Sequence, residues 1–470
     1  MHRRTFLTGT ALGAALTALP STARAATPVT SLAALQTAID AAAPGAVITL
    51  ADGTYTVPSG QPVTFKDKHG TEAAPITVVA QSRGGAVLKG KQSFAFQNSD
   101  NITLSGFSFR QSETLDVPPD CTRIRLTRND FQLADIEGVH WVMVRADYSK
   151  VDRNHFHGKS TLGIFLGIEG AGTDGMAQHV QVLKNYFSDH SYAGDNGGEP
   201  IRLGVSPRAL SSAHAVIEQN LFERTNGDPE AISVKSSDNV VRHNTLRDSR
   251  GGIVLRHGNG TQVDSNWLLG GQEGVRIYGN DHLIVNNYLS GLTGRALVIG
   301  SGTERDHLPG EPADSRRGND APDRVVIVYN TLLDNADGIS GESQRPEEPR
   351  DVVVADNLLV GGAGKLVAMA KTVRFTWQSN ILFGAAGDGN IPATGFTRVD
   401  PKLVAGSDGI SRLSAGSPAI DAATLQQTVV TYDIEGNTRG KAPDIGCDEY
   451  TTEAPVYRPL TPADVGPDAA

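Results

Sequence analysis

Short β-rich runs recur along most of the chain, each followed at a fixed place by a polar residue and then an apolar one. From about residue 100 onward, each run leads to an asparagine, and an aromatic residue or a leucine stands two positions later. The pattern occurs at Asn129/Phe131, Asn154/Phe156, Asn185/Phe187, Asn220/Phe222, Asn244/Leu246, Asn266/Leu268, Asn287/Leu289, Asn330/Leu332, Asn357/Leu359 and Asn380/Leu382. Most steps between successive asparagines span 21 to 31 residues, within the repeat lengths typical of solenoid proteins.

This repeat predicts an all-β fold, a single-stranded right-handed parallel β-helix. Runs such as Val352-Val353-Val354 are typical of short strands. An asparagine at one turn can bond to the asparagine of the next coil and to the turn backbone, while leucine and phenylalanine fill the interior. A propeller and a β-sandwich are the alternatives. Propeller blades repeat at about 40–50 residues, and a sandwich gives no reason for a column of asparagines.

The two ends of the chain carry different patterns. Residues Thr30 to Ala43 place apolar side chains at helical spacing and predict an N-terminal helical cap over the exposed first coil. The segment from Thr431 to Tyr450 is rich in Asp and Gly, and we expect it to close the solenoid. Residues 451–470 are predicted to be a C-terminal tail that is surface-hugging or loose.

Three stretches are longer than one coil requires and predict long side loops. These are residues 302–323, Gly167–Met176 and Ser188–Gly198. Loops of this kind are often functional. Because they lie on both sides of the stretch that begins at Asp228, we expect them to form the walls of a groove.

The first 25 residues have the pattern of a twin-arginine signal peptide. Arg3 and Arg4 precede an apolar run from Ala11 to Leu19, and Ala23-Arg24-Ala25 follows as a cleavage site. We therefore expect a mature protein that begins near Ala26, with a β-helix catalytic domain over residues 26–450. The expected location is secreted or periplasmic.

Charge and cysteine content narrow the classes of partner. The chain has 42 Lys and Arg against 52 Asp and Glu, a net charge of −10, which argues against nucleic acid as a partner. No other segment approaches the length of a membrane span, so no membrane partner is expected once the signal is removed.

Cys121 and Cys447 lie too many coils apart to pair and are predicted to be free thiols. We expect a monomer.

Aligning consecutive coils on their asparagines gathers charged residues in one place. Lys235, Arg256 and Tyr278 lie nine or ten residues before their asparagines, and strand alternation predicts that all three point outward in one column. The coil before places Gly204 in that column, with Glu199 at the position of Glu230. Further outward groups near the column are Arg202, His257 and Arg276. Together they suit an anionic polymer.

At these residues the chain resembles polysaccharide lyase family 6, which comprises alginate lyases and chondroitinase B. The resemblance rests on Asn196-Gly197-Gly198-Glu199, on Glu230 five residues before Lys235-Ser236, and on Leu255-Arg256-His257-Gly258. It implies that Asn196, Asp228 and Glu230 hold Ca²⁺, that Lys235 is the base and that Arg256 is the acid. Asp228 stands where the family usually has glutamate, a side chain longer by one methylene. The three residues nevertheless supply hard oxygen donors, as Ca²⁺ requires.

The residue types also suit β-elimination from a 4-linked uronate. The proton at C5 is a poor acid while the adjacent carboxylate stays charged, and a cation beside that carboxylate stabilises the enolate-like intermediate. Arg256 is always charged, so it can also stabilise negative charge that develops on the leaving O4. The expected substrate is an anionic polysaccharide, alginate first and dermatan sulfate as the alternative.

Three other functions remain open from the residues. A C5-epimerase shares the proton abstraction without cleaving the chain. A glycoside hydrolase would use Asp228 and Glu230 as its carboxylate pair and leave Lys235 and Arg256 without a role. A β-helical adhesin or carbohydrate-binding module would bind polymer and release no product.

Overall fold

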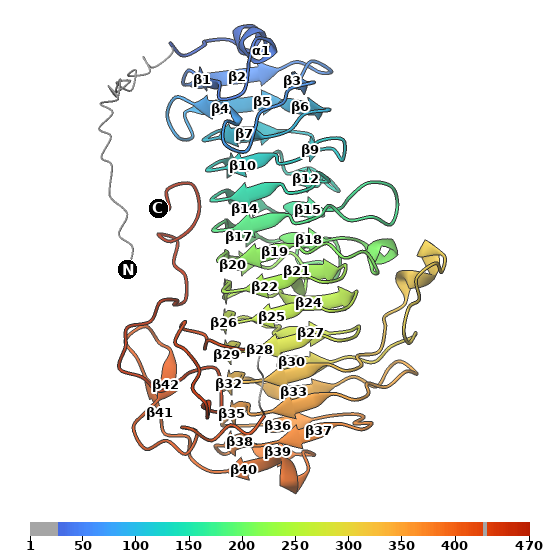
Figure 1. Ribbon diagram of the computed structural model, residues 1–470, viewed down its shortest axis with the longest axis vertical. Helices are drawn as coiled ribbons and strands as arrows, with labels where there is room; N and C mark the ends of the chain where they lie inside the picture. Colours follow the sequence, from blue (N-terminus) through green and yellow to red (C-terminus); the bar gives the residue numbers. More distant parts are fainter. Residues whose placement is uncertain (1–26, 426–429) are drawn as a thin grey trace, which may run out of the picture.

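The computed structural model describes residues 27–425 and 430–470 of the 470-residue chain. Strands of successive coils pair in parallel and build three long sheets, so the chain forms the predicted right-handed parallel β-helix (Figure 1). The predicted signal peptide, residues 1–25, lies outside the described residues. No helix among the described residues is long and apolar enough to cross a membrane.

Each long sheet takes no more than one strand from a coil. The 13-stranded sheet contains β1 (Val47–Leu50), β4 (Ile76–Ala80), β7 (Ile102–Ser105), β10 (Arg125–Thr127), β13 (Lys150–Asp152), β16 (Gln181–Leu183), β19 (Val216–Glu218), β22 (Val240–Arg242), β25 (Gln262–Asp264), β28 (Leu283–Val285), β31 (Val326–Val328), β34 (Val353–Ala355) and β37 (Thr376–Gln378). The 14-stranded sheet contains β2 (Gly53–Val57), β5 (Ala86–Gly90), β8 (Ser108–Gln111), β11 (Asp130–Phe131), β14 (His155–Lys159), β17 (Tyr186–His190), β20 (Leu221–Thr225), β23 (Thr245–Arg247), β26 (Trp267–Leu269), β29 (Tyr288–Ser290), β32 (Thr331–Leu333), β35 (Leu358–Val360), β38 (Asn380–Phe383) and β40 (Phe396–Arg398).

The third long sheet carries the predicted site residues. This 11-stranded sheet contains β9 (Leu115–Val117), β12 (Val142–Val144), β15 (Leu166–Ile168), β18 (Ile201–Leu203), β21 (Glu230–Lys235), β24 (Gly252–His257), β27 (Val275–Ile277), β30 (Arg295–Ile299), β33 (Asp337–Gly341), β36 (Lys365–Ala368) and β39 (Gly387–Gly389). Two short pairs complete the strands: β3 (Val63–Lys66) with β6 (Phe94–Gln97), and the antiparallel β41 (Leu403–Ala405) with β42 (Ser411–Leu413). The 3₁₀ helices are η1 (Ser206–Arg208), η2 (Ala313–Arg317) and η3 (Ala393–Gly395).

The predicted asparagine ladder holds the turn between the 13-stranded and the 14-stranded sheet. Each of the ten asparagines is buried, and from Asn129 to Asn357 each donates its side-chain amide to the side-chain oxygen of the next. That oxygen also accepts the backbone N–H of the preceding asparagine, as Asn154 does from Asn129 at 2.9 Å. A non-glycine residue with positive φ precedes each rung, for example Arg128 at +56°. The ladder bonds offset the cost of this left-handed backbone.

Apolar side chains fill the interior in columns, as the pattern predicted. Phe109, Phe131, Phe156, Phe187 and Phe222 stack coil upon coil, with ring centroids 4.6 to 5.0 Å apart. Because each ring buries a large apolar area against its neighbours, the column stabilises the coil along its axis.

The N-terminal cap is the predicted helix, and it is shorter than the predicted range Thr30 to Ala43. Helix α1 (Leu32–Asp40) begins after Ser31, whose side chain accepts the backbone N–H of Ala34. Its apolar residues Leu35 and Ile39 are fully buried against the first coil. The cap therefore shields interior side chains that would otherwise face water.

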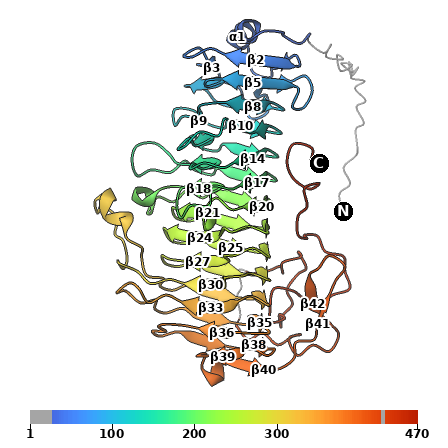
Figure 2. The same ribbon diagram turned by 180° about the vertical axis from the view of Figure 1, so that it is seen from behind.

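The C-terminal segment does not close the end of the solenoid, and that prediction was wrong. The coils end at β40, and the chain then turns back along the outside of the β-helix (Figures 1 and 2). Arg439 bonds to Asn286, and the backbone of Gly446 bonds to Asp356, both residues of the ladder turn. Residues 456–470 follow the surface as far as Arg83, whose side chain forms an ion pair with Asp468, and Arg153 contacts the carbonyl of Ala470. Cys121 and Cys447 are buried and free, as predicted.

Candidate active site

Four neighbouring strands of the 11-stranded sheet, β18, β21, β24 and β27, carry most of the predicted site residues. Arg202, Ser233, Val254 and Arg276 pair across successive coils and form one outward column. The residues expected inside, Val234, Leu255 and Ile277, are fully buried. The outward prediction for Arg202 and Arg276 is therefore confirmed.

The predicted pairing of Lys235 with Arg256 is wrong by one residue. Val234 pairs with Leu255, but Lys235 pairs with His257, so Arg256 is the extra residue of a β-bulge in β24. A bulge redirects the side chain at its extra residue and is common beside functional sites. Here it places His257 opposite Lys235 and leaves Arg256 as its neighbour along the strand.

Gly204 lies beside the bulge, in the column of Lys235 as expected. Its φ is +86°, and a β-carbon there would lie 2.7 Å from the carbonyl oxygen of Lys235. The backbone of the neighbouring coil therefore approaches closely, which only glycine permits at this φ.

The Nζ atom of Lys235 contacts Glu199, a residue that we did not predict to have a role. Glu199 Oε1 lies 3.3 Å from Nζ, and the two side chains are 1% and 13% exposed. The other oxygen of Glu199, Oε2, is buried with no hydrogen-bond partner among the described residues. The signal was present in the sequence, because Glu199 occupies the position of Glu230 one coil earlier.

Arg256 is half-buried and lies over the ring of Tyr278, 5.7 Å from the centroid. Tyr278 was predicted to point outward, but it is buried, and its hydroxyl donates to Glu342 Oε2 at 2.8 Å. Arg276 and Arg345 lie near the same ring, at 6.0 and 5.2 Å. The ring of Tyr278 therefore makes cation–π contacts with these three arginine side chains, which cover it.

His257 was predicted to point outward near the column, but its side chain is buried. Its Nε2 atom lies 2.9 Å from Ser206 Oγ in η1. Burial, together with the positive charges of Arg256 and Lys235, lowers the pKa of His257 to about 3. The imidazole is therefore neutral.

Asp228 belongs to a group of three carboxylates with Glu199 and Glu230. Burial raises the pKa of Asp228 to about 7, and the charges of Glu199 and Glu230 also raise it. Its oxygens accept the backbone N–H groups of Gly198 and Glu230, at 3.0 and 2.6 Å. The repulsion among the three carboxylates and the unpartnered Glu199 oxygen suit a hard divalent cation such as Ca²⁺, and the three side chains would have to draw together around it, because their oxygen atoms do not all lie within 4.8 Å of one another.

The other two predicted calcium ligands are placed differently. Glu230 is neutralised in part by Arg276, whose Nη2 atom lies 2.9 Å from Oε1, and Ser233 donates to Oε2 at 2.5 Å. Asn196 lies in the exposed loop between β17 and β18. The structure therefore brings Asp228 and Glu230 together and shows no contact from Asn196 to either of them within the described residues.

Arg202 belongs to a cationic cluster on the neighbouring coils. Glu169 contacts Arg202 at 3.3 Å, Arg208 at 3.7 Å and Arg145 at 3.8 Å, while Arg145 also bonds to Asp116. Arg208 is buried, whereas the side chains of Arg145 and Arg202 are 30% and 15% exposed and place positive charge beside the site, which suits an anionic polymer.

One of the predicted long loops, residues 302–323, meets a loop that we did not predict at one side of the site. The loop after β30 carries η2 and reaches the loop after β18 that carries η1 (Figure 1). Arg316 of η2 donates to the carbonyl of Pro207 in η1 at 2.9 Å. Since η1 also supplies the hydroxyl that contacts His257, these loops form a wall beside the predicted catalytic residues.

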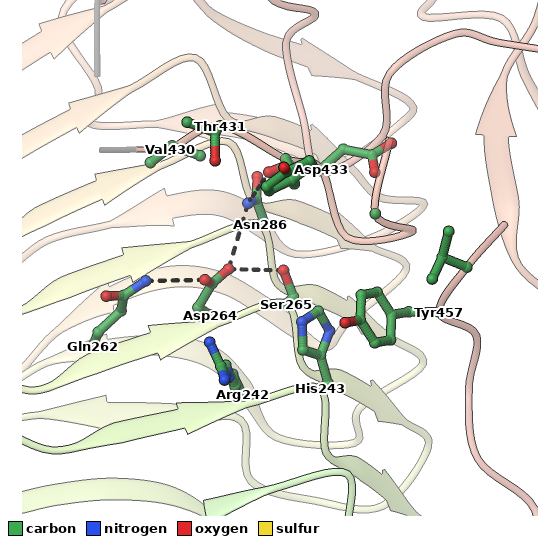
Figure 3. A pocket seen from close by; sticks show the side chains of 13 residues that line it. Arg242, His243, Gln262, Asp264, Ser265, Asn286, Val430, Thr431, Asp433 and Tyr457 are labelled. Atoms are coloured by element: carbon green, nitrogen blue, oxygen red, sulfur yellow. Dashed lines mark hydrogen bonds between the residues drawn. The ribbon is translucent and has the colours of Figure 1, made fainter. Parts of the chain in front are cut away.

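A separate cavity of about 580 Å³ lies where the C-terminal segment covers the 13-stranded sheet (Figure 3). Asp264 occupies its centre and bonds to Gln262, Ser265 and Asn286, and Tyr457 stacks on His243 at one edge. None of the predicted site residues lines it.

Known proteins resemble the chain along most of its length. The sequence model of the chondroitinase B family matches residues 29–360, more than half of the chain. No curated protein matches the sequence. Among solved structures, the alginate lyase AlyGC of polysaccharide lyase family 6 shares 26% identity with a TM-score of 0.73 over 92% of this chain. The present chain spans 59% of the length of AlyGC.

Two further structures share the fold. A mannuronic acid specific family 6 lyase from human gut microbiota has 23% identity, a TM-score of 0.67, and coverage of 78% of this chain and 89% of its own. The family 6 lyase Pedsa3628 from Pseudopedobacter saltans has 22% identity, a TM-score of 0.63, and coverage of 94% and 99%. With the family match and the β-helix geometry, these likenesses show that the chain belongs to the chondroitinase B family, polysaccharide lyase family 6.

Proposed function

We propose that the protein cleaves a 4-linked uronic-acid polysaccharide, alginate, by β-elimination. The observation that carries this proposal is the pair of cations at the bulge between β21 and β24. Lys235 is held by Glu199, Arg256 is supported by the ring of Tyr278, and neutral His257 pairs with Lys235 across the strands. A hydrolase needs two opposed carboxylates and gives these cations no role.

In this mechanism Lys235 acts as the base. Its amine takes the proton from C5 of the uronate, the electron pair forms the C4–C5 double bond, and the bond from C4 to O4 breaks. Arg256 remains charged and donates hydrogen bonds to the leaving oxygen, which stabilises the negative charge that develops there. The leaving oxygen then takes a proton from water, and the ammonium of Lys235 returns its proton to the hydroxide ion that forms. Glu199 and the Tyr278 ring position the two groups.

Ca²⁺ is the cofactor that we propose for this site, held by Asp228, Glu230 and Asn196. When bound, it would neutralise the carboxylate next to C5 and make the C5 proton more acidic. The crowded carboxylates support this assignment, because without a cation the negative form of Asp228 is disfavoured. Glu199, whose Oε2 atom has no partner among the described residues, is a further oxygen donor next to the same group.

Alginate is the proposed substrate because AlyGC, the similar structure with 26% identity, is an alginate lyase. The family model carries the name of chondroitinase B, so dermatan sulfate is the second polymer to test. We further propose that the protein acts outside the cytoplasm after twin-arginine export, because residues 1–25 have the pattern of that signal.

The test is to incubate the purified protein with alginate and with dermatan sulfate and to follow the ultraviolet absorbance of the unsaturated uronate. We expect absorbance to rise when the unaltered protein is incubated with alginate. We expect no comparable rise when the variant Lys235→Ala replaces it. Lys365→Ala is a matched control, because Lys365 is exposed on β36 of the same sheet. Formation of the absorbing product by Lys235→Ala at the rate of the unaltered protein would overturn the assignment of the base. A new reducing end without unsaturation would indicate hydrolysis, and an inverted sugar without cleavage would indicate epimerisation.

A further inference from the structure

A cluster of two histidines and one aspartate lies on the 14-stranded sheet, apart from the strands that carry the candidate active site. Asp130 in β11 pairs with His155 in β14, and His157 stands two residues further along the same strand. Since side chains alternate along a strand, both imidazoles lie on the outer face, while Phe131 and Phe156 point inward.

The three side chains converge on one oxygen atom. Asp130 Oδ1 lies 2.8 Å from His157 Nε2 and 4.0 Å from His155 Nδ1. One donor atom from each residue lies within 4.8 Å of the other two, and among the described residues this is the one group of three His, Cys, Asp or Glu side chains that does so.

We propose that Asp130, His155 and His157 bind a divalent transition metal ion, with Zn²⁺ as the ion that their chemistry favours. Two imidazole nitrogens and one carboxylate oxygen are common zinc ligands. Metal–ligand distances of about 2.0–2.1 Å in a tetrahedron require neighbouring ligand atoms about 3.3–3.4 Å apart. The 2.8 and 4.0 Å separations lie on either side of that value, so small side-chain rotations suffice.

The surroundings of His155 orient it for this role. Its Nε2 atom lies 3.0 Å from Ser188 Oγ. When Ser188 accepts a hydrogen bond from Nε2 of His155, the proton is on Nε2 and the lone pair of Nδ1 is free to bind a metal ion. The ring of Tyr186 stacks on the imidazole with centroids 4.4 Å apart. Outer partners of this kind fix the tautomer and the ring plane of metal-binding histidines.

Arg110 does not block the site, because it bonds to the other oxygen of Asp130, Oδ2. It holds the carboxylate in place while Oδ1 faces the histidines. The three ligand side chains are 23% to 25% exposed, so an ion can enter from solvent and water can fill the remaining position. Three protein ligands with one open position is the arrangement of zinc sites that keep a bound water.

The test is titration of tag-free, metal-free full-length mature protein with Zn²⁺ by calorimetry and with Co²⁺ by visible absorption, both in excess Ca²⁺. We expect Co²⁺ bands of a tetrahedral site, and a loss of Zn²⁺ affinity of about 100-fold or more in His155→Ala and in His157→Ala. Ser188→Ala should weaken binding by about 10-fold through the lost orienting bond.

His69→Ala is the matched control, because His69 contacts Asp100 at 2.7 Å without a second histidine in the group. It should bind Zn²⁺ as the unaltered protein does. The proposal is overturned if the unaltered protein binds no Zn²⁺, or if His155→Ala and His157→Ala bind it equally well. If an alanine variant does not fold, His155→Gln and His157→Gln keep a polar side chain and must show the same loss. Release of unsaturated uronate by these variants should be unchanged, so the result does not depend on the proposed lyase activity.

Discussion

Glu199 Oε1 lies 3.3 Å from the Nζ atom of Lys235, and both side chains are largely buried between neighbouring coils. The carboxylate comes from Glu199, two residues before β18, and the lysine ends β21. This ion pair fixes where the lysine amine lies relative to the groove, and it connects the proposed base to the acidic group around Asp228.

Glu199→Gln should therefore lower kcat by about 10-fold or more while KM changes less, because the substituted amide holds the amine less firmly. The loss should stay below that of Lys235→Ala, which removes the base and should cost about 10²–10⁴-fold. Initial rates of unsaturated product at several substrate concentrations measure both constants. Glu218→Gln, which breaks an ion pair with Arg242 on the 13-stranded sheet, is the control and should be active. Equal kcat in Glu199→Gln and in the unaltered protein would contradict the role of Glu199.

Substitutions of Tyr278 can distinguish two roles of this residue: support of Arg256 by the aromatic ring, and proton transfer by the hydroxyl. Its ring lies beneath Arg256, and its hydroxyl is occupied by Glu342. We expect Tyr278→Phe to keep activity within about 10-fold, since the cation–π contact is retained, and Tyr278→Leu to lose much more. Product formation by the two variants, with thermal unfolding as a check on folding, measures the difference. If Tyr278→Phe were as inactive as Lys235→Ala, the hydroxyl would be part of the chemistry.

Removal of calcium should lower both activity and stability. An ion that binds only the folded protein raises the free energy of unfolding, by about 2.7 kcal/mol at 100 times its Kd. We expect added Ca²⁺ to raise Tm and a chelator to reverse the effect. In the double variant Asp228→Asn, Glu230→Gln, Tm should not respond to Ca²⁺. Asp351→Asn is the control, because Asp351 lies far along the chain in an exposed pair with Arg374. An identical Tm response in the double variant would place the calcium elsewhere.

His282 should make the protein less stable in mild acid. Its Nδ1 atom accepts the backbone N–H of Thr261, and Nε2 bonds to the carbonyl of Tyr278, so the buried imidazole is neutral. Burial lowers its pKa to about 4 from an ordinary value of 6.5. Between these values the unfolded chain binds a proton that the folded protein does not. The stabilisation is therefore complete above pH 6.5 and is lost as the pH falls toward 4.

From pH 7 to pH 5 this single group should remove about 2 kcal/mol of stability. Urea denaturation at the two pH values should show a smaller decrease for His282→Gln than for the unaltered protein. His214→Gln, at an exposed histidine, should leave the decrease unchanged. Identical decreases in His282→Gln and the unaltered protein would show that His282 is not the group responsible.

The repeating features of the fold were predictable from the order of residues. The asparagine column from Asn129 to Asn380, the phenylalanine stack and the outward direction of Arg202 and Arg276 follow from local rules. Strand alternation has a period of two, and one coil repeats after a nearly constant number of residues, so position along the chain determines both face and rung.

Other features depended on contacts between coils, and only the tertiary structure decided them. The bulge that places His257 opposite Lys235 depends on how two neighbouring backbones accommodate one extra residue. Tyr278 became buried because Glu342 and Arg345, more than sixty residues later, close over it. The return of the C-terminal segment along the β-helix rests on side-chain contacts such as Arg439 with Asn286, 153 residues apart. No local period encodes such contacts, because their energy depends on shapes and charges that meet only after the coils have stacked.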